Sequence, residues 1–122
     1  MARRRPSTPG IDGILLVDKA NGPTSHDVVA KVRRIAGQPR IGHGGTLDPL
    51  ATGILPVALG EATKLAGRML DASKVYDFTI TFGTQTDSLD LEGQVIAQSD
   101  VRPTLAAVDA VLPKFTGPIT QI

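Results

Sequence analysis

Hydrophobic and polar positions near the start of the chain predict a strand followed by a helix. An apolar run at residues 13–17 lies between turn signals and fits a buried strand. Apolar residues at helical spacing follow, with Thr24 or Ser25 able to cap the helix and Gly37 able to end it. The apolar positions of this helix are Val28, Val29, Val32 and Ile35.

The middle of the chain changes from a loop-like pattern to regular ones. Residues 41–53 hold four glycines and show no period, so we expect a structured loop. A strand is predicted at residues 54–59, where Pro56 favours the edge of a sheet or the first strand position because proline lacks an N–H. Residues 61–70 predict a short helix. Its apolar side carries Leu65, Met69 and Leu70.

The second half of the chain shows the clearest alternation. Residues 74–82 predict a half-buried strand, followed by a polar loop at residues 83–93 and a second strand at residues 94–98. We expect these two strands to pair antiparallel. Residues 103–112 predict an amphipathic helix. The side chains expected to face inward are Tyr76, Phe78, Ile80 and Phe82 on the strand and Leu105, Val108, Val111 and Leu112 on the helix.

Length and composition narrow the class of protein. Strands and helices mix without regular alternation, which predicts an α+β fold with a largely antiparallel sheet. The chain has 122 residues, of which 41% are hydrophobic and 20% charged, as in a folded domain or part of one. Residues 1–10 have little to bury, so we expect a flexible basic arm before a folded part over residues 11–122.

Absent features exclude several classes. Without cysteine, disulfides, thiolate metal sites and thiol nucleophiles are excluded. The longest aliphatic run is too short for a membrane span, and no apolar signal-peptide region follows the N-terminal arginines. We therefore expect a cytoplasmic protein that does not bind membranes.

Charge is distributed unevenly along the chain. Residues 1–40 carry eight Lys or Arg and three Asp, a net +5, whereas residues 41–122 carry five basic and nine acidic residues, a net −4. Clustered basic residues suit a polyanion such as nucleic acid, although a solvated helix face would give the same pattern. The candidate phosphate contacts on the predicted helix are Lys31, Arg33 and Arg34.

The glycine-rich loop is the main candidate for chemistry. It frames His43 and Asp48, and Asp48 is either a catalytic carboxylate or a cap for the next element. Phosphate-loop, dinucleotide and serine-triad motifs do not match the spacing. The two histidines, His26 and His43, lie on different predicted elements, so no metal cage is expected. Tyr76 either packs in the core or offers its ring to a base.

The loop and its surroundings resemble the signature of the TruB family, the bacterial tRNA pseudouridine synthases that modify the T-loop uridine. The resemblance covers nearly everything after the arm. Ala20 departs from it, since the family usually has proline there, which affects turn stiffness and not chemistry. The matching residues are Gly42-His43, 45–49 (GTLDP), 51–55 (ATGIL), 13–19 (GILLVDK), 22–25 (GPTS), 60–64 (GEATK), 74–76 (KVY), Gly83, Thr86, Asp87, Asp90 and Gly93.

The resemblance implies a pseudouridine synthase fold that binds RNA in a basic cleft without a cofactor or a metal. It implies that Asp48 is the essential aspartate, that Tyr76 packs on the target base and that His43 engages the RNA. Lys19 and Asp90 are implied as substrate-binding neighbours of the active site. The implied reaction isomerises the T-loop uridine to pseudouridine after the base is flipped out. The implied partner is the tRNA T-arm, bound by a monomer that needs no protein partner.

Two alternatives stay open: a subunit of a guide-RNA-directed pseudouridine synthase, and a non-catalytic RNA-binding fragment. Whether Asp48 attacks the base, attacks the sugar or removes a sugar proton also stays open. The resemblance places a required arginine and a C-terminal RNA-binding module beyond Ile122. We therefore expect residues 11–122 to be the N-terminal portion of a catalytic domain, and the chain alone to be a poor enzyme.

Overall fold

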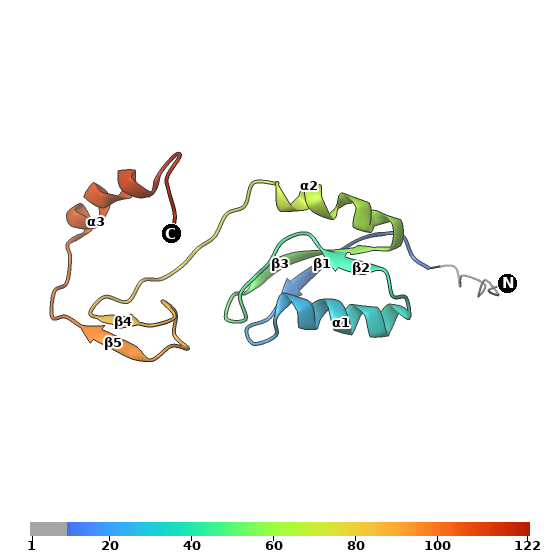
Figure 1. Ribbon diagram of the computed structural model, residues 1–122, viewed down its shortest axis with the longest axis horizontal. Helices are drawn as coiled ribbons and strands as arrows, with labels where there is room; N and C mark the ends of the chain where they lie inside the picture. The colour runs from blue at the N-terminus through green and yellow to red at the C-terminus, as the bar shows by residue number, and fades with distance from the viewer. Residues whose placement is uncertain (1–9) are drawn as a thin grey trace. The chain divides into compact units, whose positions relative to one another are not determined.

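The computed structural model describes residues 10–122, so the predicted arm lies almost entirely outside the described residues. The chain divides into two compact units, the first ending at Val75 and the second running from Tyr76 to Ile122 (Figure 1). Each unit combines antiparallel strands with helices, which confirms the predicted α+β class. No helix within residues 10–122 combines the length and apolar character that a bilayer crossing requires.

The first unit is built on a sheet of three antiparallel strands. Its order is β1 (Gly13–Lys19), β3 (Gly53–Leu59) and β2 (Ile41–His43), with β3 in the centre. Strand β2 falls in the stretch predicted to be loop, so that prediction was wrong for its three residues. A strand this short has no readable period and exists because β3 pairs with it. The end pairs of the register are Gly13 with Leu59, Lys19 with Gly53, Ile41 with Leu59 and His43 with Val57.

Pro56 lies inside the central strand, so the edge or first position predicted for it was wrong. It stands opposite Leu16 of β1, and its carbonyl accepts a 2.9 Å hydrogen bond from the N–H of Gly44, just past the end of β2. The N–H and C=O of a strand residue point to the same side, so the side of Pro56 that lacks an N–H faces Gly44. The pair of Gly44 and Pro56 therefore has one hydrogen bond instead of two, and β2 ends at His43, one residue before it.

Helix α1 (Ser25–Ala36) begins and ends at the predicted signals. The hydroxyl of Thr24 accepts from the N–H of Asp27 at 2.9 Å, and the Asp27 carboxylate accepts from the N–H of Thr24 at 3.0 Å. This capping box satisfies donors at the helix start, and its hydrogen bonds from Thr24 hold the pKa of the Asp27 carboxyl below its ordinary value. Gly37 follows the last turn as the C-cap.

The core of the first unit lies between α1 and one face of the sheet, while the chain after β3 covers the other face (Figure 1). Alternate residues of β3 point into this core because side chains alternate along a strand. Ile35, one of the apolar positions of the predicted helix, is 77% exposed. The buried residues are Val29, Ile41, Leu55, Val57 and Leu59, with Val17, Val28, Val32, Ala36 and Leu47 packed against them.

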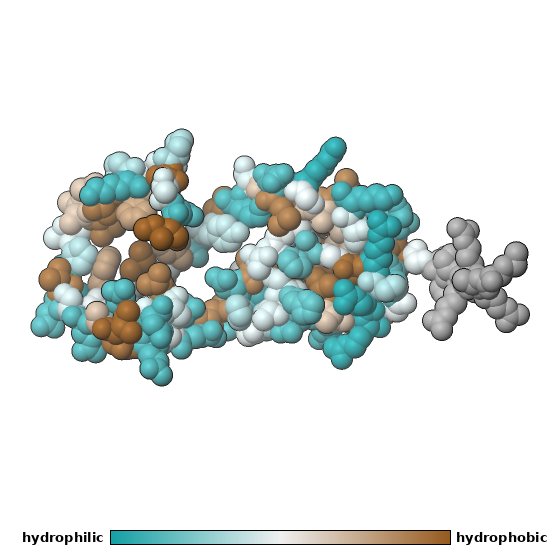
Figure 2. Space-filling model, in the orientation of Figure 1, coloured by the Kyte–Doolittle hydropathy of each residue, from teal (hydrophilic) through white to brown (hydrophobic). Residues whose placement is uncertain are grey.

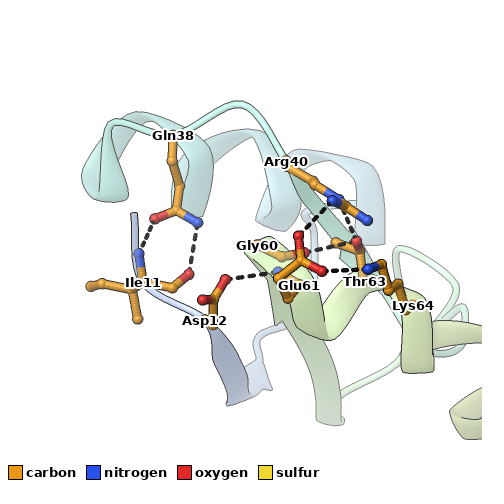
Figure 3. Close-up of polar contacts among 8 residues, drawn as sticks. All are labelled: Ile11, Asp12, Gln38, Arg40, Gly60, Glu61, Thr63 and Lys64. Carbon is orange, nitrogen blue, oxygen red and sulfur yellow. Dashed lines mark hydrogen bonds and ion pairs between the residues drawn. The ribbon is translucent and has the colours of Figure 1, made fainter. Parts of the chain in front are cut away.

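The helix predicted at residues 61–70 forms as two short pieces, the 3-10 helix η1 (Gly60–Leu65) and α2 (Ala66–Leu70). A polar network holds the start of η1 (Figure 3). Asp12 accepts from the N–H of Glu61 at 2.8 Å, and the Glu61 carboxylate pairs with Lys64 at 2.5 Å and Arg40 at 3.0 Å. These two cations, Lys64 above all, hold the pKa of the Glu61 carboxyl below its ordinary value.

In the second unit, β4 (Thr84–Thr86) pairs with β5 (Val95–Gln98). The second predicted strand is thus confirmed, but its partner lies inside the predicted polar loop. The strand predicted at residues 74–82 was wrong, since residues 74–81 form neither helix nor strand. Alternation gives a segment two distinct faces, but a strand also needs a neighbour for its backbone hydrogen bonds, and none within residues 10–122 pairs with this segment.

The helix predicted at residues 103–112 is confirmed as α3 (Leu105–Val111), capped by Thr104 and continued by η2 (Leu112–Phe115). Its apolar side was expected to face inward, yet Leu105 is 76% exposed and Leu112 50%. The apolar residues of the segment at residues 74–82 are also exposed, with Phe78 at 80%. Figure 2 shows apolar side chains at the surface of both units. In the second unit the predicted strand at residues 94–98 and the predicted helix at residues 103–112 therefore form, but the apolar side chains expected to face inward are not buried.

The turn into η1 generates a stability prediction. Gly60 has a φ of +61°, and a Cβ there would collide with the Asp12 carboxylate and lie 2.9 Å from the carbonyl oxygen of Ile11. We expect Gly60→Ala to destabilise the first unit by more than the roughly 1–2 kcal/mol that left-handed backbone alone costs. Urea unfolding followed by the Val57 methyl signals measures this change.

Gly67→Ala is the matched control, because Gly67 lies in α2 and, apart from its chain neighbours and the backbone of its own helix, no atom lies within 4 Å of the added Cβ. It should stabilise the same unit by up to about 1 kcal/mol. Equal effects of the two substitutions would contradict the role given to the Gly60 turn.

Candidate functional site

Asp48 lies exposed in the loop that joins β2 to β3. Its carbonyl accepts a 2.9 Å hydrogen bond from the N–H of Ala51, which closes a turn with Pro49 at the second position, where proline is favoured. Within residues 10–122 the aspartate carboxylates that accept hydrogen bonds are those of Asp12, Asp27, Asp87 and Asp90, so the alternative that Asp48 caps the next element is not supported. The carboxylate is free to meet a ligand.

Lys19, the last residue of β1, holds this loop through hydrogen bonds to its backbone. Its side chain is buried, 1% exposed, and its Nζ donates to the carbonyls of Ala20 at 2.8 Å, Pro49 at 3.1 Å and Ala51 at 2.6 Å. An ammonium group has three N–H donors, and all three are used. The structure thus gives Lys19 a role in shaping the loop, while its predicted contact with substrate stays a prediction.

The turn after β1 and the first residue of α1 supply two further anchors. The N–H of Gly22 donates to the carbonyl of Pro49 at 2.7 Å. The hydroxyl of Ser25 donates to the carbonyl of Leu47 at 3.1 Å and accepts from its N–H at 2.9 Å. Asp48 is therefore held through both of its chain neighbours. Sequence reasoning considered Ser25 only as a cap, because nothing local indicates a partner 22 residues away.

His43 and Gly44 form the other end of the loop. The His43 side chain bonds through Nδ1 to the carbonyl of Gly45. A carbonyl only accepts, so Nδ1 carries the hydrogen in this contact and Nε2 is left for another partner. Gly44 is buried against Met69 of α2, whose Cε would lie 2.8 Å from an added Cβ. Met69 thus explains why glycine stands at position 44, a contact that the sequence did not predict.

Tyr76 and Asp90 belong to the second unit, whereas Lys19, His43 and Asp48 belong to the first. The Tyr76 ring is 59% exposed and is not part of a core within residues 10–122. Asp90 organises the turn after β4, where its carboxylate accepts from the Ser88 hydroxyl at 2.6 Å and the N–H of Glu92 at 2.8 Å. These bonds, that of Ser88 above all, hold the pKa of the Asp90 carboxyl below its ordinary value.

The three predicted phosphate contacts on α1 differ in their surroundings. Lys31 and Arg34 are exposed. Arg33 instead donates to the carbonyls of Pro39 at 3.2 Å and Ile41 at 3.4 Å, which ties the end of α1 to β2. Within the described part of the chain no group of three or more His, Asp or Glu could hold a metal ion.

Comparison with known proteins assigns the chain to the pseudouridylate synthases. Residues 33–122 match the family described as TruB family pseudouridylate synthase (N terminal domain). The chain belongs to this family, which confirms the resemblance seen in its motifs.

Two curated relatives are tRNA pseudouridine synthase B proteins. That of Novosphingobium aromaticivorans is 57% identical over 117 residues, covering 92% of this chain and 38% of the relative. That of Zymomonas mobilis is 56% identical over 120 residues, covering 94% of this chain and 40% of the relative. The chain thus spans about two fifths of the length of these relatives.

A solved structure of an H/ACA RNP bound to a substrate RNA containing 2'-deoxyuridine also shares similarity. It is 50% identical where it aligns, covers 46% of this chain and 18% of that chain, and has a TM-score of 0.45. This degree of likeness does not distinguish the candidate functions.

The buried ammonium of Lys19 generates a second prediction. Lys19→Met should lower the free energy of unfolding of the first unit by about 1–3 kcal/mol, because the carbonyl of Ala51 loses its donor. The same urea experiment on the Val57 methyl signals measures this. The control is Lys31→Met, an exposed position on α1, which should change stability by less than about 0.5 kcal/mol. A loss no larger than that of the control would show that the loop does not depend on Lys19.

Proposed function

We propose that this chain supplies the aspartate-bearing part of a tRNA pseudouridine synthase that isomerises the T-loop uridine. The observation that carries the proposal is the exposed Asp48 carboxylate on a loop anchored at both sides, in a chain of the TruB family. The curated relatives are named tRNA pseudouridine synthase B, which supports tRNA as the substrate. We further propose that it acts in the cytoplasm as a monomer that binds the T-arm.

The reaction needs few protein groups. It breaks the bond from uracil N1 to the sugar C1′, turns the base and rejoins it through C5, so no atom enters or leaves apart from exchange of the C5 hydrogen. A carboxylate near the sugar and a flat wall against the base meet these needs, and we assign them to Asp48 and Tyr76. Flipping the uridine out of its stack costs a few kcal/mol, which contacts to the RNA must offset.

We assign His43 to the RNA itself. Since Nδ1 is held by the loop carbonyl, its ring has a set orientation and Nε2 can bond to a nucleotide. Lys19 and Asp90 already bond to neighbouring protein groups, so we propose that they act on the substrate mainly by shaping the loop and the turn that meet it.

The catalytic role of Asp48 is tested in a hybrid protein in which residues 1–122 replace the matching 38% of the Novosphingobium aromaticivorans relative. Asp48→Asn should lower turnover by about 10³-fold or more, since an amide is neither a nucleophile nor a base. RNA affinity should stay within about threefold, because phosphate contacts dominate it. Tritium release from a T-arm hairpin with C5-tritiated uridine measures turnover.

Asp109→Asn, at an exposed position of α3, is the control and should retain full turnover. Retained turnover in Asp48→Asn would contradict the catalytic role. A hybrid that binds the hairpin but releases no tritium would favour a non-catalytic RNA-binding function, and release only with an added guide RNA would favour a guided enzyme. The chain alone, tested in parallel, should release tritium far more slowly than the hybrid.

The exposed cations of α1 generate a prediction on salt dependence. Replacing Lys31 and Arg34 together by Gln should flatten the slope of log affinity against log salt by about two, since each phosphate contact contributes roughly one unit. The loss should be the same for T-arm RNA and for an unrelated hairpin. Filter binding over a salt series measures this, with Lys114→Gln in η2 as the control. An unchanged slope would make these side chains a solvated helix face.

A further inference from the structure

Ser25 is buried, and its hydroxyl does not cap its own helix. It is the first residue of α1 and is 3% exposed. Thr24 caps the helix through its own hydroxyl and the Asp27 carboxylate. The Ser25 hydroxyl instead bonds to both backbone groups of Leu47, at 2.9 Å and 3.1 Å. A hydroxyl can donate and accept at once, so one small side chain satisfies both groups.

The Leu47 carbonyl lies in the same rigid peptide plane as the N–H of Asp48. The orientation of that plane determines where the Asp48 side chain leaves the backbone. On the other side of Asp48, the carbonyl of Pro49 is held by Lys19 and Gly22. The plane before Asp48 depends on Ser25, the residue that bonds to the backbone of Leu47 within residues 10–122.

We propose that Ser25 is a positioning residue for the reaction: its hydroxyl orients the peptide between Leu47 and Asp48 and so aims the Asp48 carboxylate. This inference rests on the proposed function, because it concerns the aspartate assigned to catalysis there. A carboxylate misplaced by about 1 Å can lose on the order of a hundredfold in rate, so a single hydrogen-bonded anchor is enough to matter.

The test compares Ser25→Ala with Thr24→Ala in the hybrid protein. Thr24→Ala removes a helix cap and so lowers stability, yet leaves the bonds to Leu47 in place. We expect Ser25→Ala to lower kcat by about tenfold or more with KM within about threefold, and Thr24→Ala to leave kcat within about threefold. Ser25→Thr keeps the hydroxyl and should restore most of the lost kcat.

Amide hydrogen exchange supplies a readout that does not depend on turnover. The N–H of Leu47 should exchange at least about tenfold faster in Ser25→Ala than in Thr24→Ala, while core amides such as that of Val57 differ little between them. Equal kcat in the two alanine variants, or an unchanged Leu47 exchange rate, would overturn the proposal. Retained turnover in Asp48→Asn would instead refute the proposed function, and the Leu47 exchange rate would still decide whether Ser25 holds the peptide.

Discussion

The buried ammonium of Lys19 is the interaction on which the candidate site depends. A charge removed from water is costly unless polar partners replace its hydration, and here three carbonyl oxygens do so. Two of them belong to Pro49 and Ala51, which follow Lys19 by 30 and 32 residues in the sequence. The loop carrying Asp48 must therefore return to the end of β1 whenever this lysine is buried. Burial of one side chain thus ties the edge strand, the loop and the central strand together.

The rest of the site follows from this return of the chain. Once the loop lies over the end of β1, the segment leading into α1 reaches it with the Gly22 N–H and the Ser25 hydroxyl. Chain neighbours of Asp48 are then held on both sides while its carboxylate is left exposed. In addition, the side chain of Met69 in α2 packs against Gly44 at the start of the loop. A rigid backbone around a free functional group is what a carboxylate needs to meet a substrate with little reorganisation.

Elements whose signals lie close together in the sequence were predicted correctly. The capping residues, apolar spacing and terminal glycine of α1 lie within a few residues of one another, and the helix formed at those bounds. The segment at residues 74–82 had an equally clear alternation but formed no strand, because strand formation needs a partner that alternation does not supply. Pro56 shows the converse, since the central strand contains a proline at the end of its pairing with β2, where a single hydrogen bond from Gly44 remains.

For the candidate site, the sequence by itself determined the residue types and their motif: the glycine-rich loop, its histidine and its aspartate, together with family membership. Tertiary structure alone decided what holds them. It separated Thr24, which caps α1, from Ser25, which bonds to Leu47, and it gave Arg33, a predicted phosphate contact, hydrogen bonds to the carbonyls of Pro39 and Ile41. The physical reason is that a hydrogen bond depends on distance in space, and the chain closes these distances only when the sheet and helix pack.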